Sequence, residues 1–163
     1  MKTTKLLAVA ISVLVSMCGY SQCLVVEWQK SLGGSYVEFA TAIQEISDGG
    51  FIVIGSSDSD DGDITSNYFL HDWWVVRLDV LGNIIWQRSL GGSGAERAYS
   101  VDETSDGGFI IAGYSNSNDH DVIVNLGMRD IWVVKLSDNG EMLWQRSLGG
   151  ASSETASSIQ ETS

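Results

Sequence analysis

The hydrophobic pattern beyond residue 21 is that of short β-strands. Residues 98–104 alternate small or apolar side chains with polar ones, which is the period of a half-covered strand. Residues 109–115 form an almost wholly apolar run rich in β-branched side chains, as in a strand covered on both faces. Residues 130–136 and 141–148 complete a set of four predicted strands. Because no stretch shows the 3.6-residue periodicity of an amphipathic helix, we expect an all-β protein.

Glycine, asparagine and aspartate mark the predicted turns, and the chain contains no proline. Residues 105–108 (Ser-Asp-Gly-Gly) accept positive φ angles and predict a tight hairpin turn of primed type. Residues 137–140 end in glycine and predict a type I turn. A polar loop, residues 116–129, separates the second predicted strand from the third.

The whole pattern recurs in units of 58 residues. Residues 28–85 and 86–143 are identical at 28 of 58 positions, and residues 144–163 match the start of the second unit at 13 of 20. Each unit opens with Trp-Gln-Lys/Arg-Ser-Leu-Gly-Gly. The equivalent strands outside the second unit are predicted at residues 40–46, 51–57, 72–78 and 156–162.

Four short antiparallel strands in tandem units of this length are typical of β-propeller blades. We therefore predict that residues 22–163 form four-stranded antiparallel blades of a partial β-propeller. A β-sandwich is the alternative, but it leaves the regular repeat unexplained. Since the chain holds about two and a third units and breaks off within a unit, we expect it to be the N-terminal part of a longer protein.

Tryptophans occupy fixed positions in the repeat. Trp28, Trp86 and Trp144 recur at one place in the last strand of each predicted blade, which predicts packing between blades rather than ligand stacking. Trp74 has a counterpart in the next unit, Trp132, and is expected in the core. Trp73 faces the other way and is expected to cover a neighbouring blade.

Two tracts carry a resemblance to known families. Residues 78–92 and 136–150 read Leu-Asp/Ser-x-x-Gly-x-x-x-Trp-x-x-x-x-Gly-Gly, which is similar to the tryptophan-docking repeat of quinoprotein-like propellers. Residues 27–163 resemble the tandem repeats of large secreted Bacteroidetes proteins, many of which end in a type IX secretion sorting domain. The resemblance implies an extracellular propeller and specifies no activity, and the chain departs from it in having no sorting domain.

The first 21 residues are expected to be a signal peptide. Lys2 and Lys5 precede an apolar run at residues 6–15, which is too short to span a bilayer about 30 Å thick. Small residues at positions 19 and 21 predict cleavage before Gln22. Lipid attachment at Cys18 is the alternative, although a bulky methionine stands before that cysteine. We expect a mature chain that is secreted or at the cell surface, without a transmembrane span.

Charge narrows the range of partners. The chain has 21 acidic and 9 basic side chains and a formal net charge of −12. Because nucleic acids and anionic lipids are bound by clustered lysine and arginine, neither is an expected partner. An acidic balance favours solubility and the binding of cations.

The polar loops hold the best candidates for a metal site. Side-chain oxygens at alternating positions suit Ca²⁺, which takes six to eight oxygen ligands. The alternative is a solvated loop whose side chains bond to their own backbone. The candidate ligands are Asp58, Asp60, Asp61 and Asp63 in one unit, and Asn116, Asn118, Asp119 and Asp121 in the next.

Catalytic constellations are not evident. His71 and His120 sit at different places in their loops, and neither belongs to a recognisable nucleophilic or metal-binding pattern. A glutamate recurs after each double glycine, and a turn role is preferred over catalysis for Glu38, Glu96 and Glu154.

These observations predict a secreted or cell-surface module for binding or adhesion, with a protein or carbohydrate ligand. The alternatives are the first part of a propeller enzyme, either a quinone-dependent dehydrogenase or a polysaccharide-active one, and an inactive truncated remnant. Blades are apolar on both broad faces, so further repeats of the same chain or self-association are expected to cover the outermost ones.

Overall fold

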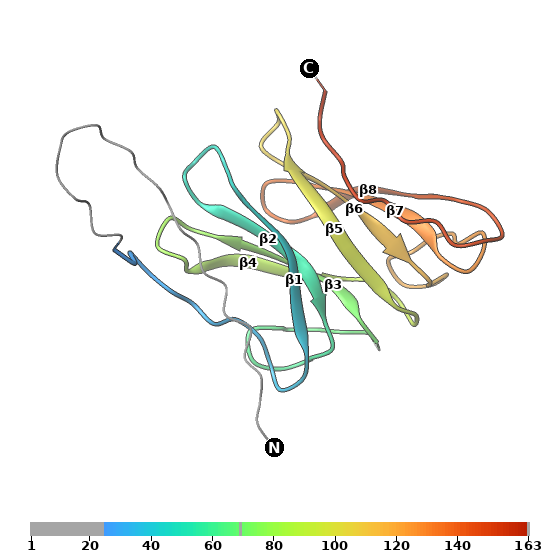
Figure 1. Cartoon of the computed structure of the whole chain (residues 1–163), viewed down its shortest axis with the longest axis horizontal. Coiled ribbons are helices and arrows are strands. Elements are labelled where there is room, and N and C mark those ends of the chain that lie inside the picture. The colour runs from blue at the N-terminus through green and yellow to red at the C-terminus, as the bar shows by residue number, and fades with distance from the viewer. Residues whose placement is uncertain (1–24, 69, 163) are drawn as a thin grey trace.

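Two four-stranded antiparallel β-sheets, one for each full repeat, make up the computed structural model (Figure 1). The structure describes residues 25–68 and 70–162. The first sheet consists, in spatial order, of β1 (Glu38–Glu45), β2 (Phe51–Ser57), β3 (Asp72–Leu78) and β4 (Ile84–Leu90). The second consists of β5 (Glu96–Glu103), β6 (Phe109–Ser115), β7 (Asp130–Leu136) and β8 (Met142–Leu148). Since the described residues contain no helix, the prediction of an all-β protein is confirmed.

The predicted segment at the N-terminus, residues 1–21, lies outside the described residues. Among those that the structure describes, no helix is long and apolar enough to cross a membrane. The four apolar strands β2, β3, β6 and β7 coincide with their predicted bounds, because a continuous apolar run between turn sequences marks both of its ends.

The last predicted strand, residues 156–162, is not a strand in the structure. The segment nevertheless follows β5: Ile159 N–H donates to Ser100 Oγ at 3.1 Å, and Ala156 N–H donates to Gly113 O at 3.4 Å. A β-ladder needs a neighbour that exchanges backbone hydrogen bonds along its whole length. In the described part of the chain this segment has none, which is why the strand prediction is wrong.

The first hairpin turn of each sheet differs from the prediction, whereas residues 137–140 form the predicted type I turn, closed by the Gly140 N–H donating to Ser137 O at 3.1 Å. Gly107 N–H donates to Thr104 O at 2.8 Å, and Gly107 has a φ of 81°, whereas Ser105 and Asp106 do not have positive φ angles. The turn is therefore type I followed by a glycine in the left-handed region, not a primed turn. The Asp106 carboxylate accepts the Gly108 N–H at 3.0 Å, which holds the aspartate in this conformation.

The apolar core lies between the two sheets. Trp73, expected to cover a neighbouring unit, is fully buried. The centroid of its ring lies 4.5 Å from that of Trp132 in the second sheet. The Trp73 indole N–H donates to Tyr114 O at 3.3 Å, so its polar atom is also satisfied across the junction. Buried residues of both sheets join them in one cluster that includes Ile52, Ile54, Val75, Phe109, Ile111, Val134 and Leu136.

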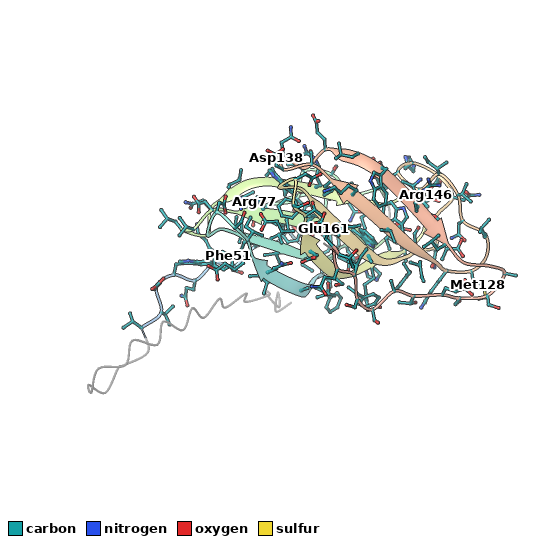
Figure 2. The ribbon with its side chains drawn as sticks, turned by 90° about the horizontal axis from the view of Figure 1, so that it is seen from above. Phe51, Arg77, Met128, Asp138, Arg146 and Glu161 are labelled. Carbon is teal, nitrogen blue, oxygen red and sulfur yellow. The ribbon has the colours of Figure 1, made fainter. Side chains whose placement is uncertain are left out.

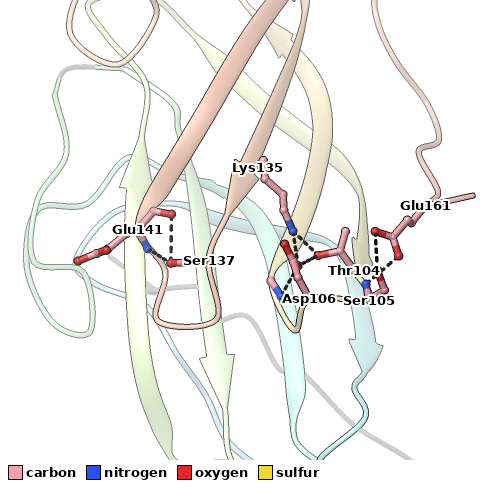
Figure 3. A network of polar contacts seen from close by, with 8 residues as sticks. Thr104, Ser105, Asp106, Lys135, Ser137, Glu141 and Glu161 are labelled. Carbon is pink, nitrogen blue, oxygen red and sulfur yellow. Dashed lines mark hydrogen bonds and ion pairs between the residues drawn. The ribbon is translucent and has the colours of Figure 1, made fainter.

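Strand β5 packs against the first sheet, next to β1 (Figure 1). Thr41 occupies a bulge in β1 and donates its hydroxyl to Ala98 O at 2.7 Å. Further along, Ser47 donates both its N–H and its hydroxyl to Glu103, each at 2.7 Å. One repeat later, Ser105 makes the same pair of contacts with Glu161 (Figure 3). The side-chain contacts between consecutive repeats thus recur along with the sequence.

A buried cation fastens the first hairpin turn of each sheet. Lys135 Nζ lies 2.7 Å from Asp106 Oδ1 and also contacts Thr104 (Figure 3). The equivalent Arg77 binds Asp48 and donates to Leu78 O at 2.8 Å. The hydrogen bond from Lys135, helped by that from Thr104, holds the pKa of Asp106 well below its usual range.

We predict that Lys135→Met lowers the melting temperature at neutral pH. Because the folded-state pKa of Asp106 is depressed, its contribution to stability is present above about pH 4 and is lost as the pH falls through the folded pKa. The difference from wild type, measured by calorimetry, should be largest near neutrality and shrink in acid. Arg146→Met, which removes an exposed cation (Figure 2), serves as the control. Equal effects of the two variants would contradict the assignment.

Candidate functional site

The acidic loops pack against the Gly-Gly-Ser turn of their own repeat. Asp63 Oδ2 accepts the Gly33 N–H at 3.0 Å. Asp61 accepts the Ser35 N–H at 2.7 Å together with the Ser35 hydroxyl. The second repeat makes the same backbone contacts, from Asp121 to Gly91 at 3.1 Å and from Asp119 to Ser93 at 2.8 Å. Four of the predicted calcium ligands therefore hold a turn in place.

The other four candidate ligands are dispersed. Asp58 Oδ1 faces His71 Nδ1, and Asn118 accepts the Asn125 N–H at 3.1 Å. The two remaining side chains are partly or fully open to solvent, namely Asp60 and Asn116. In the part of the chain that the structure describes, no group of three or more His, Cys, Asp or Glu side chains could hold a metal ion. Calcium binding stays a prediction from the sequence.

The glutamate after each double glycine closes the same turn from the other side. Glu96 Oε2 accepts the Gly92 N–H at 3.1 Å, while Oε1 accepts hydroxyls of Ser115 and Ser117, each at 2.7 Å. The first repeat repeats this arrangement around Glu38, with Gly34, Ser57 and Ser59. The turn role predicted for these glutamates is confirmed.

Sequence reasoning missed the partner of Glu96. Asp72 begins β3 and is fully buried, and its Oδ2 accepts the Tyr68 N–H at 2.6 Å. Its Oδ1 has no hydrogen-bond partner among the described residues. A Cβ placed on Gly91 would lie 2.6 Å from Glu96 Oε2 and closer still to Asp72 Oδ1, so the two carboxyl groups converge on one point. The available signal was an aspartate that opens a mostly apolar strand in both repeats.

The next junction has the same geometry. Asp130 begins β7, is almost fully buried, accepts the Leu126 N–H, and has an Oδ1 without a partner among the described residues. A Cβ on Gly149 would lie 2.5 Å from Glu154 Oε2 and closer still to Asp130 Oδ1. A pair of facing carboxyl groups is therefore a recurrent feature of the boundary between repeats.

Burial dominates the electrostatics of the first pair. It raises the pKa of Asp72 to about 7, with the Tyr68 N–H opposing this shift and the charge of Glu96 adding to it. Burial also raises the pKa of Asp121, against the effect of the Gly91 N–H. Because Asp72 and Glu96 have no exposed surface, they cannot contact a substrate, and a role as catalytic acid and base is excluded.

Two of the three repeated tryptophans, Trp28 and Trp86, pack on a neighbouring sheet. Trp86, in β4, lies edge-on to Phe109 with ring centroids 5.9 Å apart, contacts Gly140, and donates its indole N–H to Asp138 O at 2.9 Å. Trp28 makes the equivalent edge contact with Phe51 of the first sheet, at 5.6 Å. Each of these side chains thus docks on the sheet that follows it in the chain.

Apolar surfaces remain open at both ends of the stack. Trp144, the third repeated tryptophan, is 44% exposed. On the first sheet, Ile43, Val53 and Trp74 line an apolar groove beside Trp28. Their counterparts in the second sheet, Val101, Ile111 and Trp132, are buried against the first sheet.

The polar loop of the second repeat presents a different surface. Ile123 is 74% exposed and Met128 is 70% exposed, and Val124 and Leu126 between them are also exposed. The position equivalent to Ile123 in the first repeat is Thr65. The positions equivalent to Leu126 and Met128 are Tyr68 and Leu70, which are also exposed, so the accessible apolar chemistry of the two loops differs at Ile123 and Val124.

No protein-family profile matches the chain, and no curated protein matches it. The geometry of the described residues is therefore the basis for a proposed function. That geometry consists of a turn held by carboxylates, a buried junction between repeats, and an exposed apolar loop.

We predict that Gly92→Ala destabilises the protein whereas the repeat-related Gly150→Ala does not. A Cβ on Gly92 would overlap Asp119 Oδ1 and lie 2.7 Å from Ser117 Cβ, while a Cβ on Gly150 would meet nothing within 4 Å. Overpacking of this kind costs about 1–3 kcal/mol. Urea denaturation of the two variants measures the difference, and equal stabilities would show that the loop does not pin the turn.

Proposed function

We propose that this chain is a secreted or cell-surface repeat module of β-propeller type that binds a protein or carbohydrate ligand. One observation carries the proposal: many of the residues that repeat make contacts within the fold, whereas Ile123 and Val124 are exposed apolar side chains in a loop whose equivalent positions in the first repeat, Thr65 and Ser66, are polar. Residues that make binding specific are expected in loops carried on a rigid scaffold.

The propeller reading is supported by the way consecutive sheets stack. The rings of Trp73 and Trp132 contact each other at a tilt of 51° across the junction, and Trp86 docks on the following sheet, as the tryptophan-docking resemblance implies. The exposed Trp144 and the groove beside Trp28 are the surfaces on which the same stacking would continue. Further repeats of the same chain, or self-association, would cover them.

The binding surface that we assign is the apolar end of the second repeat's loop. Figure 2 places Met128 at the end of the molecule opposite Phe51, away from the hairpin turns. Ile123, Val124 and Leu126 belong to the same loop and are exposed. Apolar side chains that cluster on a surface mark interaction sites more often than scattered ones do, which favours a protein ligand or the apolar face of a sugar ring.

The double variant Ile123→Ser/Met128→Ser tests the assignment. We expect it to keep the wild-type melting temperature, because both side chains are exposed, and to lose saturable binding in a screen against soluble polysaccharides and purified extracellular proteins. Biolayer interferometry with the full mature chain provides the readout. Val80→Ser/Leu81→Ser, which changes two exposed apolar residues in the β3–β4 turn, is the matched control and should bind normally.

Saturable binding that survives in the loop variant would contradict the assigned surface. An absence of saturable binding to every probe by the wild-type chain would contradict the proposed function itself.

A further inference from the structure

We propose that Asp72 and Glu96 share one proton, and that this proton fastens the junction between the two repeats and makes it weaken in alkaline solution. Asp72 comes from the first sheet and Glu96 from the second, so the pair spans the boundary between repeats. The Glu96 N–H also donates to His71 O at 2.7 Å, which ties the two chain segments together beside the carboxyl groups.

The hydrogen-bond donors around the pair are accounted for. Glu96 has three, namely the Gly92 N–H on Oε2 and the Ser115 and Ser117 hydroxyls on Oε1. Asp72 has one, the Tyr68 N–H on Oδ2, and its Oδ1 is left facing a carboxylate oxygen. Two carboxylates in contact cannot both remain ionised in a buried site. A proton on Asp72 Oδ1 converts this repulsive contact into a hydrogen bond to Glu96 Oε2.

The proton belongs on Asp72 because the Glu96 carboxylate accepts more hydrogen bonds from its surroundings than the Asp72 carboxylate does. Hydrogen bonds to an ionised carboxylate favour the charged form, and Glu96 accepts three against one for Asp72. The direction agrees with the pKa of Asp72, which burial raises to about 7.

The charged groups around the pair do not neutralise it. Asp121 adds a third carboxylate, whose charge further raises the pKa of Asp72. The two nearby imidazoles are engaged elsewhere, since His71 faces Asp58 and His120 stacks on Tyr68 with ring centroids 4.3 Å apart.

The basic side chains next to Glu96 and at the hairpin turns are engaged elsewhere. Arg97, next to Glu96 in β5, lies over the Phe39 ring at 5.5 Å. Arg77 and Lys135 are paired with Asp48 and Asp106 at the hairpin turns. No basic side chain named above pairs with the two carboxyl groups, and the described carboxylates form no group of three that could hold a metal ion. A proton is therefore the positive charge that we assign to the pair.

The sign of the pH effect follows from the raised pKa. Between about pH 4 and about pH 7 the folded protein binds a proton at Asp72 that the unfolded chain does not, so unfolding is disfavoured most in acid. This contribution is complete below the unfolded pKa and is lost as the pH rises through the folded pKa. The raised pKa of Asp121 acts in the same direction.

Asp72→Asn tests the proposal, because its amide can accept the Tyr68 N–H through the oxygen and donate to Glu96 through the nitrogen at any pH. We expect the wild-type melting temperature to fall by about 5 °C or more between about pH 5 and about pH 8. The Asp72→Asn variant should lose much of this dependence and melt above wild type at pH 8. Asp138→Asn removes the same charge from an exposed turn and should follow wild type.

An Asp72→Asn variant that keeps the full pH dependence, or that melts below wild type at pH 8, would overturn the proposal. The proposal would also be overturned if, at pH 8, calcium raised and EDTA lowered the melting temperature of the wild type but not that of the variant, because the pair would then hold a cation. A carbon-13 titration of the wild-type carboxyl groups by NMR needs no variant. It should show Asp72 titrating near pH 7, and titration near pH 4 would contradict the shared proton.

Discussion

Each sheet of this protein is apolar on both broad faces, and every other feature depends on that constraint. In β3, Trp73 and Val75 pack towards the second sheet, while Trp74 and Val76 belong to a separate cluster on the opposite face. Burying one tryptophan removes 150–250 Å² from water, worth about 4–6 kcal/mol at about 25 cal/mol per Å². A single sheet cannot gain this on both sides, so the repeats stabilise one another by stacking.

Polar residues of the repeat satisfy the backbone of the turns at the edge of each stacked sheet. The Gly-Gly-Ser turn that leads from one sheet to the next has backbone N–H groups that no β-ladder pairs, and a buried N–H without an acceptor is costly. Loop carboxylates and the recurring glutamate accept these groups, as Asp121 does for Gly91 and Glu96 for Gly92. The same arrangement brings Glu96 against Asp72, so the carboxyl pair is a consequence of closing the turn beside a buried strand.

Sequence reasoning succeeded where a residue's role depends on its own repeat or on strand alternation. The apolar strands were predicted to the residue, and Trp73 was correctly expected to face a neighbouring unit. It failed where the outcome depends on a partner in space. Residues 156–162 have strand-like alternation but no ladder partner among the described residues, and the turn at Gly107 is decided by contacts of the preceding aspartate. The Asp72–Glu96 pair needs the registration of two sheets, which no pattern within one strand contains.

Stacking across the Trp73–Trp132 contact is the central claim, and hydrogen exchange of Trp73→Ala tests it most directly. The substitution should cost about 3–5 kcal/mol, as expected for truncating a buried tryptophan. Because the two sheets share one core, amide protection should fall in β6 and β7 of the second sheet as well as in β2 and β3 of the first. Loss of protection confined to the first sheet would contradict the account, since it would show that the repeats fold independently of their junction.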